Sequence, residues 1–138
     1  MSPKPLFLLS LPRSGSTLVQ RVLATHPEIA TAAEPWVALP QLYATHGSGV
    51  YAEYGYGPST RAIREFAETL PGGDDAYRAE VRAFLLRVYA LAGGSATYFL
   101  DKTPRYTLAA SELLDLFPDA KAQPGHEWFY VARSVEGI

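Results

Sequence analysis

The chain has 138 residues, the usual size of one domain, and 48% of them are hydrophobic, as in ordinary soluble globular proteins. Its 12 Lys and Arg residues face 14 Asp and Glu, so it lacks the bulk positive charge that binds nucleic acid or anionic membranes. The absence of cysteine excludes disulfides, zinc-thiolate sites and a cysteine nucleophile. The apolar run near the N-terminus is too short for a signal peptide or a membrane span, so we expect a soluble, cytoplasmic protein.

The first part of the chain reads as strand, loop and helix. Residues 6–10, LFLLS, are apolar without alternation, which favours a strand buried on both faces of a parallel sheet. Residues 17–25 carry leucines and valines at helical spacing. His26 and Pro27 end this helix, because the residue before a proline avoids the helical conformation.

The middle of the chain predicts irregular structure and then two helices. Glu34 is a conspicuous polar residue in apolar company, and residues 43–58 combine glycines with four tyrosines without a period, which is typical of a long loop. A helix capped by Ser59 is expected to run to about residue 70. Residues 74–92 form the longest predicted helix, because their apolar residues make a strong stripe at helical spacing.

The last part of the chain repeats the alternation of strands and helices. Residues 97–100 predict a second buried strand, residues 107–117 a helix, and residues 128–132 a third strand. Strands that alternate with helices indicate right-handed crossovers and a short parallel sheet. We therefore predict an α/β, three-layer fold with helices on both sheet faces, and a single domain over residues 1–138.

Basic side chains follow each of the predicted strands. Arg13 follows the first strand, Lys102 and Arg105 follow the second, and Arg133 follows the third. In an open parallel sheet, ligands bind beyond the carboxyl ends of the strands. The sequence therefore predicts a local anion site at this edge of the sheet.

The loop after the first strand suits a tetrahedral anion. Ser14, Gly15, Ser16 and Thr17 offer small residues whose backbone amides can converge on a phosphate or sulfate, at the positive end of the following helix. The usual nucleotide loop, GxxxxGK[ST], is absent. Arg13 replaces its lysine, and a guanidinium can hold two oxygens of one tetrahedral group.

Four segments together resemble a known family, the sulfotransferases that use 3'-phosphoadenosine 5'-phosphosulfate (PAPS). Residues 12–18, PRSGSTL, resemble the phosphosulfate loop of the branch that includes tyrosylprotein and bacterial small-molecule sulfotransferases. Residues 33–35, AEP, are similar to the segment that carries its catalytic base, and residues 101–105, DKTPR, to its DK-x-P motif. Residues 129–133, FYVAR, resemble the strand and arginine that open its 3'-phosphate site.

The resemblance implies a P-loop-like fold and transfer of a sulfuryl group from PAPS to the hydroxyl or amine of a small-molecule or peptide acceptor, without a metal. Arg13, Lys102 and the loop amides of residues 14–17 would stabilise the leaving group. Glu34 would take the acceptor proton, with apolar neighbours raising its pKa. Arg133 would contact the 3'-phosphate. Trp36 and the tyrosine-rich loop would form the acceptor pocket, unless these tyrosines pack on the core instead.

Two departures from the family leave alternatives open. Residues 122–128 intervene where the family passes almost directly into the third strand, and family members are usually much longer, so the chain resembles the N-terminal part of such an enzyme, truncated at its C-terminus. It is then either a sulfotransferase or a non-catalytic fragment that binds PAPS or 3'-phosphoadenosine 5'-phosphate (PAP). Because a small domain buries little surface, self-association as a homo-oligomer is plausible. An ATP-dependent kinase or hydrolase is a third alternative, with Asp101 its one candidate magnesium ligand. Glu34 also reads as a solvated loop carboxylate.

Overall fold

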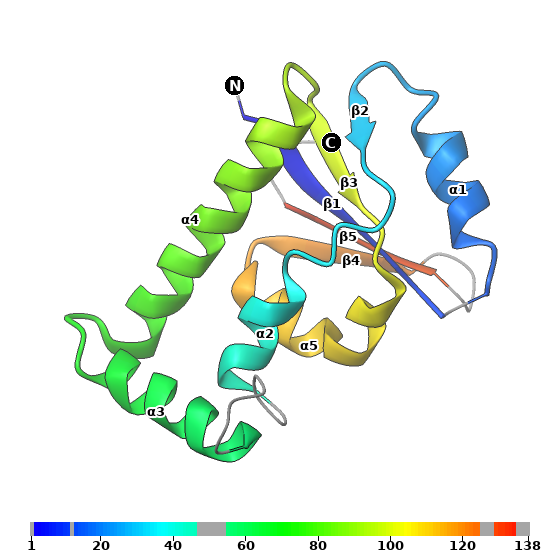
Figure 1. Ribbon diagram of the computed structural model, residues 1–138. Helices are drawn as coiled ribbons and strands as arrows, with labels where there is room; N and C mark the ends of the chain where they lie inside the picture. Colours follow the sequence, from blue (N-terminus) through cyan, green and yellow to red (C-terminus); the bar gives the residue numbers. More distant parts are fainter. Residues whose placement is uncertain (1, 12, 47–54, 125–128, 135–138) are drawn as a thin grey trace.

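A mixed five-stranded sheet forms the centre of the computed structural model, which describes residues 2–11, 13–46, 55–124 and 129–134. Its strands are β1 (Lys4–Ser10), β2 (Ile29–Thr31), β3 (Tyr98–Asp101), β4 (Ala120–Pro124) and β5 (Phe129–Ser134), in the order β2-β3-β1-β5-β4. The helices are α1 (Ser16–Leu23), α2 (Leu39–Thr45), α3 (Tyr56–Glu68), α4 (Gly73–Gly93), the 3-10 helix η1 (Pro104–Ala109) and α5 (Ala110–Leu116). Figure 1 shows α4 along one side of the sheet and α1 on the other.

The direction of the strands changes across the sheet. β1, β2 and β3 are parallel, which confirms a short parallel sheet in this part of the fold. The prediction that the third strand continues it is wrong, because β5 runs antiparallel to β1 and pairs with an unpredicted strand, β4. Only four residues separate Pro124 from Phe129, too few for the crossover that parallel neighbours require. β4 and β5 therefore pair as antiparallel neighbours.

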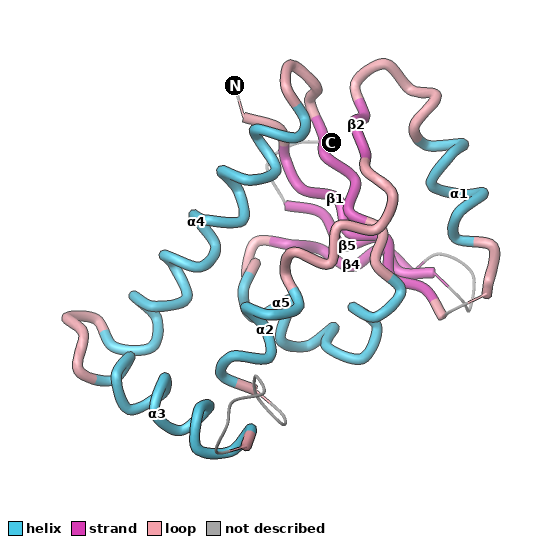
Figure 2. The backbone as a smooth tube through the Cα atoms, in the orientation of Figure 1, coloured by secondary structure: helices cyan, strands magenta, loops and turns pink. Residues whose placement is uncertain are grey.

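Helices cover both faces of the sheet, as predicted. The alternation of side chains along β1 sends Phe7 and Leu9 to one face, where they pack with residues of α2, α4, η1 and α5. Leu6 and Leu8 lie on the other face with Val19 of α1. The described residues thus form three layers, helix, sheet and helix, which the tube in Figure 2 also shows.

The longest helix agrees closely with its prediction. α4 spans Gly73–Gly93, and its fully buried residues Leu85 and Tyr89 face the core. α3 begins at Tyr56, earlier than predicted, because Gly55 takes a positive φ of 94° directly before it. Two further elements, β2 and α2, were not predicted, and the end of α2 overlaps the start of the predicted loop 43–58. Residues 47–54 of the predicted tyrosine-rich loop lie outside the described residues.

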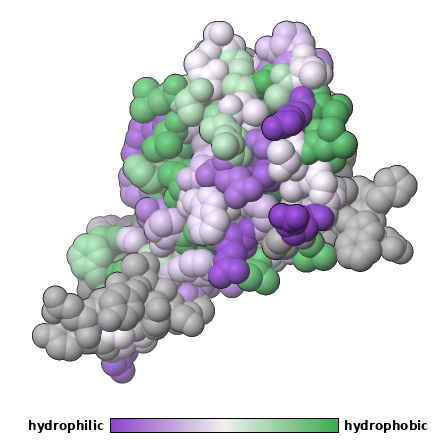
Figure 3. Space-filling model, turned by 45° about the vertical axis from the view of Figure 1, so that its right-hand side comes forward, coloured by the Kyte–Doolittle hydropathy of each residue, from purple (hydrophilic) through white to green (hydrophobic). Residues whose placement is uncertain are grey.

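α1 covers its face of the sheet with only half of its apolar residues. Val19 and Leu23 pack against the sheet, whereas Leu18 and Val22 are 68% and 61% exposed. Figure 3, which turns this side of the molecule forward, shows hydrophobic and hydrophilic surface side by side. In the described residues, no helix is both long and apolar enough to cross a membrane.

Candidate functional site

Two residues of the loop between β1 and α1 have a left-handed backbone conformation. Arg13 has a φ of 63° and Gly15 a φ of 84°. The Ser14 hydroxyl donates a hydrogen bond of 2.6 Å to the Leu11 carbonyl oxygen, which ties the loop to the end of β1. The first amides of a helix have no acceptor within the helix, so those of Ser16 and its neighbours are available to an anion. Residues 13–17, called the anion cradle below, thus begin α1 directly beyond β1, and their binding of an anion stays a prediction.

Lys102 lies directly after β3 and reaches the start of α1. Its side chain is almost completely buried, and its Nζ lies 3.4 Å from Thr17 Oγ1. β1 and β3 are parallel neighbours, with Phe7 opposite Asp101, so the segments that follow them emerge at the same edge of the sheet. The parallel pairing therefore brings the two predicted basic clusters together.

Glu34 completes this arrangement from the loop after β2. Its Oε1 accepts a hydrogen bond of 2.7 Å from the Lys102 ammonium, and its Oε2 accepts one of 3.3 Å from the Trp36 indole. The expectation that apolar neighbours raise the pKa of Glu34 is wrong: the hydrogen bond from Lys102 lowers it, and slight burial opposes this only in part. The Glu34 side chain is 39% exposed, so water still reaches its carboxylate.

An open groove of about 540 Å³ joins these side chains, a volume within the range of small-molecule sites. The charged residues among the described ones that line it are three cations, Arg13, Lys102 and Arg105, and one acid, Glu34. The lining is completed by Gly15, Ser16, Thr17, Trp36 and Pro104. A net positive lining next to a helix N-terminus favours an anionic ligand.

A second groove of about 650 Å³ adjoins the first, and Thr17, Glu34 and Lys102 line both. It runs between α1 and the loop after β2, with Ala32 and Ala33 on its wall. The ion pair of Glu34 and Lys102 therefore stands between two openings, one beside the anion cradle and one lined mainly by small residues.

Gln20 of α1 was not singled out from the sequence, yet it shapes the second groove. Its amide nitrogen lies 2.8 Å from Thr31 Oγ1, 2.5 Å from the Ala32 carbonyl oxygen and 3.0 Å from that of Ala33. Gln20 is buried, so these contacts replace water for its amide. This side chain fastens the segment before Glu34 to α1.

The structural role of Asp101 was also not predicted from the sequence, which suggested it only as a magnesium ligand. Its carboxylate is completely buried and accepts hydrogen bonds from the hydroxyls of Tyr89 (2.6 Å), Tyr106 (2.8 Å) and Thr103 (2.9 Å). Burial raises the pKa of Asp101, and the three hydrogen bonds oppose that rise. The signal available in the sequence was an aspartate directly after an apolar strand, followed by Thr103 and Tyr106.

Contrary to the prediction, Arg133 does not lie beside the groove. Its backbone lies inside β5, opposite Leu6 near the start of β1, whereas the groove lies beyond Ser10 at the other end of that strand. The expectation that it sits just past the end of a third parallel strand is wrong, because the antiparallel direction of β5 reverses the position of its last residues. Its role in binding the 3'-phosphate stays a prediction.

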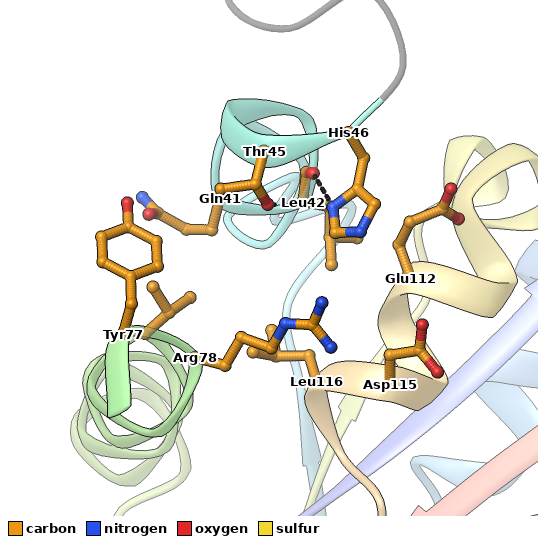
Figure 4. Close-up of a pocket in the computed structure, with 10 residues that line it drawn as sticks. Gln41, Leu42, Thr45, His46, Tyr77, Arg78, Glu112, Asp115 and Leu116 are labelled. Carbon is orange, nitrogen blue, oxygen red and sulfur yellow. Dashed lines mark hydrogen bonds between the residues drawn. The ribbon is translucent and has the colours of Figure 1, made fainter. Parts of the chain in front are cut away.

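A separate pocket lies between α2, α4 and α5, away from these residues (Figure 4). His46 lines it, with Nδ1 2.9 Å from Thr45 Oγ1 and 3.2 Å from the Leu42 carbonyl oxygen, and Arg78 of α4 points into it. The residues described hold no cluster of three or more His, Asp or Glu side chains that is arranged for a metal ion.

Comparison with known proteins identifies relatives over most of the chain. Residues 5–122 match the model of the "Sulfotransferase family". Nodulation protein NoeE of Sinorhizobium fredii is 34% identical over 87% of this chain and 28% of its own length. Protein-tyrosine sulfotransferase 2 of Gallus gallus is 32% identical over 84% of this chain and 29% of its own. Protein-tyrosine sulfotransferase 1 of Mus musculus is 30% identical over the same shares. The matched region therefore spans less than a third of each of these relatives, and no solved structure matches the chain.

Proposed function

The chain belongs to the sulfotransferase family, and from this premise we propose that it binds PAPS in a P-loop-like fold and takes part in sulfuryl transfer to an acceptor hydroxyl or amine. The observation that carries the proposal is the meeting of Lys102, Glu34 and Thr17 at one groove, with Nζ of Lys102 2.7 Å from Glu34 Oε1 and 3.4 Å from Thr17 Oγ1. These residues come from three separate segments of the chain, each of which resembles a motif of the family.

The cradle provides the groups that such a ligand requires. In transfer from PAPS, the bond between sulfur and the bridging oxygen breaks, the acceptor oxygen or nitrogen takes the sulfuryl group, and PAP leaves with the bridging oxygen on its 5'-phosphate. Arg13 and the amides of residues 14–17 bind the phosphate oxygens, and Lys102 stabilises the negative charge that grows on the bridging oxygen. The described residues fit the phosphosulfate end of the ligand, because the lining of the groove carries three cations against one acid.

Glu34 serves as the base that receives the acceptor proton. Its lowered pKa keeps the carboxylate ionised at neutral pH, ready to accept a proton, although it also makes the carboxylate a weaker base while Lys102 donates to it. When Lys102 turns toward the leaving group, its hydrogen bond to Glu34 weakens and the pKa of the carboxylate rises. The ion pair thereby links stabilisation of the leaving group to the strength of the base.

The acceptor enters through the adjoining groove between α1 and the loop after β2. The lining of this groove includes Glu34 and Lys102 but not Arg13, which lines the first groove, so acceptor and donor would meet at the ion pair. The relatives named above include protein-tyrosine sulfotransferases, and on that basis the acceptor class is a small molecule or a peptide. Of the two alternatives for the tyrosine-rich loop, Tyr43 takes the second and packs against the hydrophobic core.

A second candidate function, binding of PAP or PAPS without turnover, is favoured by the position of Arg133. Its backbone lies opposite Leu6, away from the groove, so the described residues provide no evident partner for a 3'-phosphate there. This candidate requires the same cradle and differs only in the chemical step.

A kinase or hydrolase would need a residue that binds magnesium, and Asp101 does not serve as one in the described residues. Asp101 was its one candidate, and both of its carboxylate oxygens accept hydroxyl donors in the core. The residue is completely buried, so it presents no oxygen to a magnesium ion in the groove.

Calorimetric titration with PAP, AMP and ATP with magnesium tests the proposal. We expect PAP to bind more tightly than ATP with magnesium, and Arg13→Ala to weaken PAP binding by about tenfold or more, since a charge-assisted hydrogen bond contributes about 1.5–3 kcal/mol. Arg87→Ala is the matched control, because Arg87 is exposed on α4 and lines a different groove. Equal losses in both variants would contradict the assignment of the cradle.

Sulfuryl transfer from labelled PAPS to a simple phenol separates the two candidates. Transfer that is abolished by Glu34→Gln while PAP still binds supports the enzyme. Tight PAP binding without transfer to phenol, amine or tyrosine peptide supports the binding fragment. Preferential binding of ATP with magnesium would overturn both.

A further inference from the structure

We propose that Asp101 is a positioning residue, whose buried carboxylate orients the hydroxyls of Thr103 and Tyr106 so that they hold the backbone that places Glu34 against Lys102. This inference rests on the proposed function, because it concerns the geometry of the proposed base. It goes further in assigning a role to a buried carboxylate that touches neither ligand nor groove.

Asp101 determines where the hydroxyl protons of Thr103 and Tyr106 point. A hydroxyl group has one proton to donate, and Asp101 accepts that proton from Thr103 at 2.9 Å and from Tyr106 at 2.8 Å. Each oxygen is then left with lone pairs to accept a donor from elsewhere. Thr103 Oγ1 accepts the Trp36 amide at 3.3 Å, and the Tyr106 oxygen accepts the Ala38 amide at 3.2 Å.

The two amides belong to the segment that directly follows Glu34. Trp36 and Ala38 follow Glu34 in the chain, and Trp36 takes an unusual φ of 57°, which the surrounding contacts must stabilise. The Trp36 indole also donates to Glu34 Oε2 at 3.3 Å. Fixing the backbone of Trp36 therefore fixes one of the two donors that orient the Glu34 carboxylate.

The backbone of Lys102 is held by the same cluster. It stands between Asp101 and Thr103 in the chain, so both of its neighbours belong to the hydrogen-bonded cluster. All three residues are at least 98% buried, with exposures of 0%, 2% and 0% along the chain. The same cluster thus holds the backbone of Lys102 and the segment after Glu34, the two halves of the ion pair.

Tyr89 provides a matched control for Tyr106, because both tyrosines donate to the same Asp101 oxygen. Their rings pack edge-on against Phe7 at nearly equal distances, 6.1 Å for Tyr89 and 6.2 Å for Tyr106. Tyr106 accepts the Ala38 amide, whereas the hydrogen bond described for Tyr89 goes to Asp101. Replacing either by phenylalanine removes one donor to Asp101, but only Tyr106→Phe removes the link to the Glu34 segment.

The experiment compares these two variants in the full chain. We expect Tyr106→Phe to speed hydrogen exchange of the Ala38 amide and to lower kcat for sulfuryl transfer by on the order of tenfold or more, since small displacements of reacting groups are costly. Tyr89→Phe should change both by less than about twofold. The dissociation constant of PAP should stay within about twofold in both, because Arg13 and the loop are untouched.

A second pair keeps the test decisive if a tyrosine variant does not fold. Thr103→Val removes the hydroxyl at nearly constant shape and should speed exchange of the Trp36 amide, whereas Thr103→Ser keeps the hydroxyl and should restore wild-type exchange and kcat. Equal behaviour of Val and Ser, or of the two tyrosine variants, would overturn the proposal and leave the cluster a purely structural one.

One readout separates this proposal from the proposed function. If the wild-type chain transfers no sulfuryl group, the pKa of Glu34 measured by carboxyl NMR still reports its distance from Lys102. The positioning role then predicts a pKa closer to its ordinary value in Tyr106→Phe and Thr103→Val than in Tyr89→Phe and Thr103→Ser. An unchanged pKa in all four variants would overturn it.

Discussion

Glu34 and Lys102 form an ion pair of 2.7 Å although they lie 68 positions apart in the chain. Lys102 is buried and Glu34 is partly exposed, so the pair lies at the boundary between the core and the groove. The β1–β3 and β2–β3 pairings create this contact, because all three strands end at the same edge of the sheet.

The ion pair predicts a dependence of stability on pH. Lys102 lowers the pKa of Glu34 in the folded protein below its ordinary value of 4.5, so the unfolded chain binds more protons in this range. The stabilisation is therefore complete above pH 4.5 and is lost as the pH falls through the folded pKa. We expect the difference in unfolding free energy between wild type and Glu34→Gln to grow with pH, by less than about 1 kcal/mol for a partly exposed pair.

Denaturant unfolding of both proteins from pH 2 to 7 measures this difference. The raised pKa of Asp101 acts with the opposite sign, because its folded state holds the proton more tightly and loses stability as the pH rises. Both proteins retain Asp101, so its contribution cancels in the comparison. A difference that is constant with pH would show that the pair is not formed in solution.

Because Arg13 has a positive φ, replacing it by glycine or by alanine should affect PAP binding equally but stability differently. Arg13→Gly and Arg13→Ala both remove the guanidinium, so PAP binding should weaken equally in both. Only glycine relieves the left-handed conformation at φ 63°, which costs other residues about 1–2 kcal/mol. After the greater flexibility of glycine in the unfolded chain is counted, Arg13→Gly should be more stable than Arg13→Ala by about 1 kcal/mol. Equal unfolding free energies would contradict the loop conformation.

Gly15 permits a test of conformation without steric conflict. An added Cβ at Gly15 meets no atom within 4 Å, so Gly15→Ala should be destabilising by about 1 kcal/mol through its φ of 84° alone. Gly57 in α3 also has open space around its Cβ position, and its φ is not in the left-handed range. There the same substitution should be neutral or stabilise by up to about 1 kcal/mol. Thermal unfolding of the two variants compares the signs directly.

Two leucines of α4 allow the contribution of core packing to the unfolding free energy to be measured. Leu85 is completely buried and Leu91 is 86% exposed. Leu85→Ala should lower the unfolding free energy by about 2–5 kcal/mol, whereas Leu91→Ala should stay within about 0.5 kcal/mol of wild type. Denaturant titration checks both values. Similar effects at the two positions would mean that α4 packs through a different face.

The sequence predicted the elements whose signals are local. The apolar run of β1, the stripe of α4 and the glycine-containing loop before α1 all fall close to their expected positions. Arg13 and Lys102 line one groove because their predicted places, each after a strand, imply a common edge once the strands are parallel. Glu34 joins them from the loop after β2, a strand that was not predicted. Pattern and topology were sufficient for this part of the site.

Other features depend on interactions that a linear pattern does not contain. Strand β2 has only three residues and exists because it pairs with β3. The direction of β5 depends on the short connection from β4, which was not predicted, and this error carried over to the placement of Arg133. Asp101, Tyr89 and Tyr106 meet from different elements, so their hydrogen bonds became visible only in three dimensions.

Several expectations from the sequence stay predictions. They include the single-domain organisation over residues 1–138, the truncation at the C-terminal end, the cytoplasmic location and the homo-oligomer. The same is true of the site roles assigned to Glu34, Lys102, Arg13 and Arg133, which the experiments above address.

The parallel pairing of β1 with β3 also determines when the groove forms during folding. Thr17 and Lys102 are 85 residues apart in the chain, so loop closure over this distance must precede their contact. A folding intermediate that contains only local helices would therefore have no affinity for the ligand. Ligand added during refolding should leave the early steps unchanged and slow unfolding of the native protein, because it binds only after the crossover has closed.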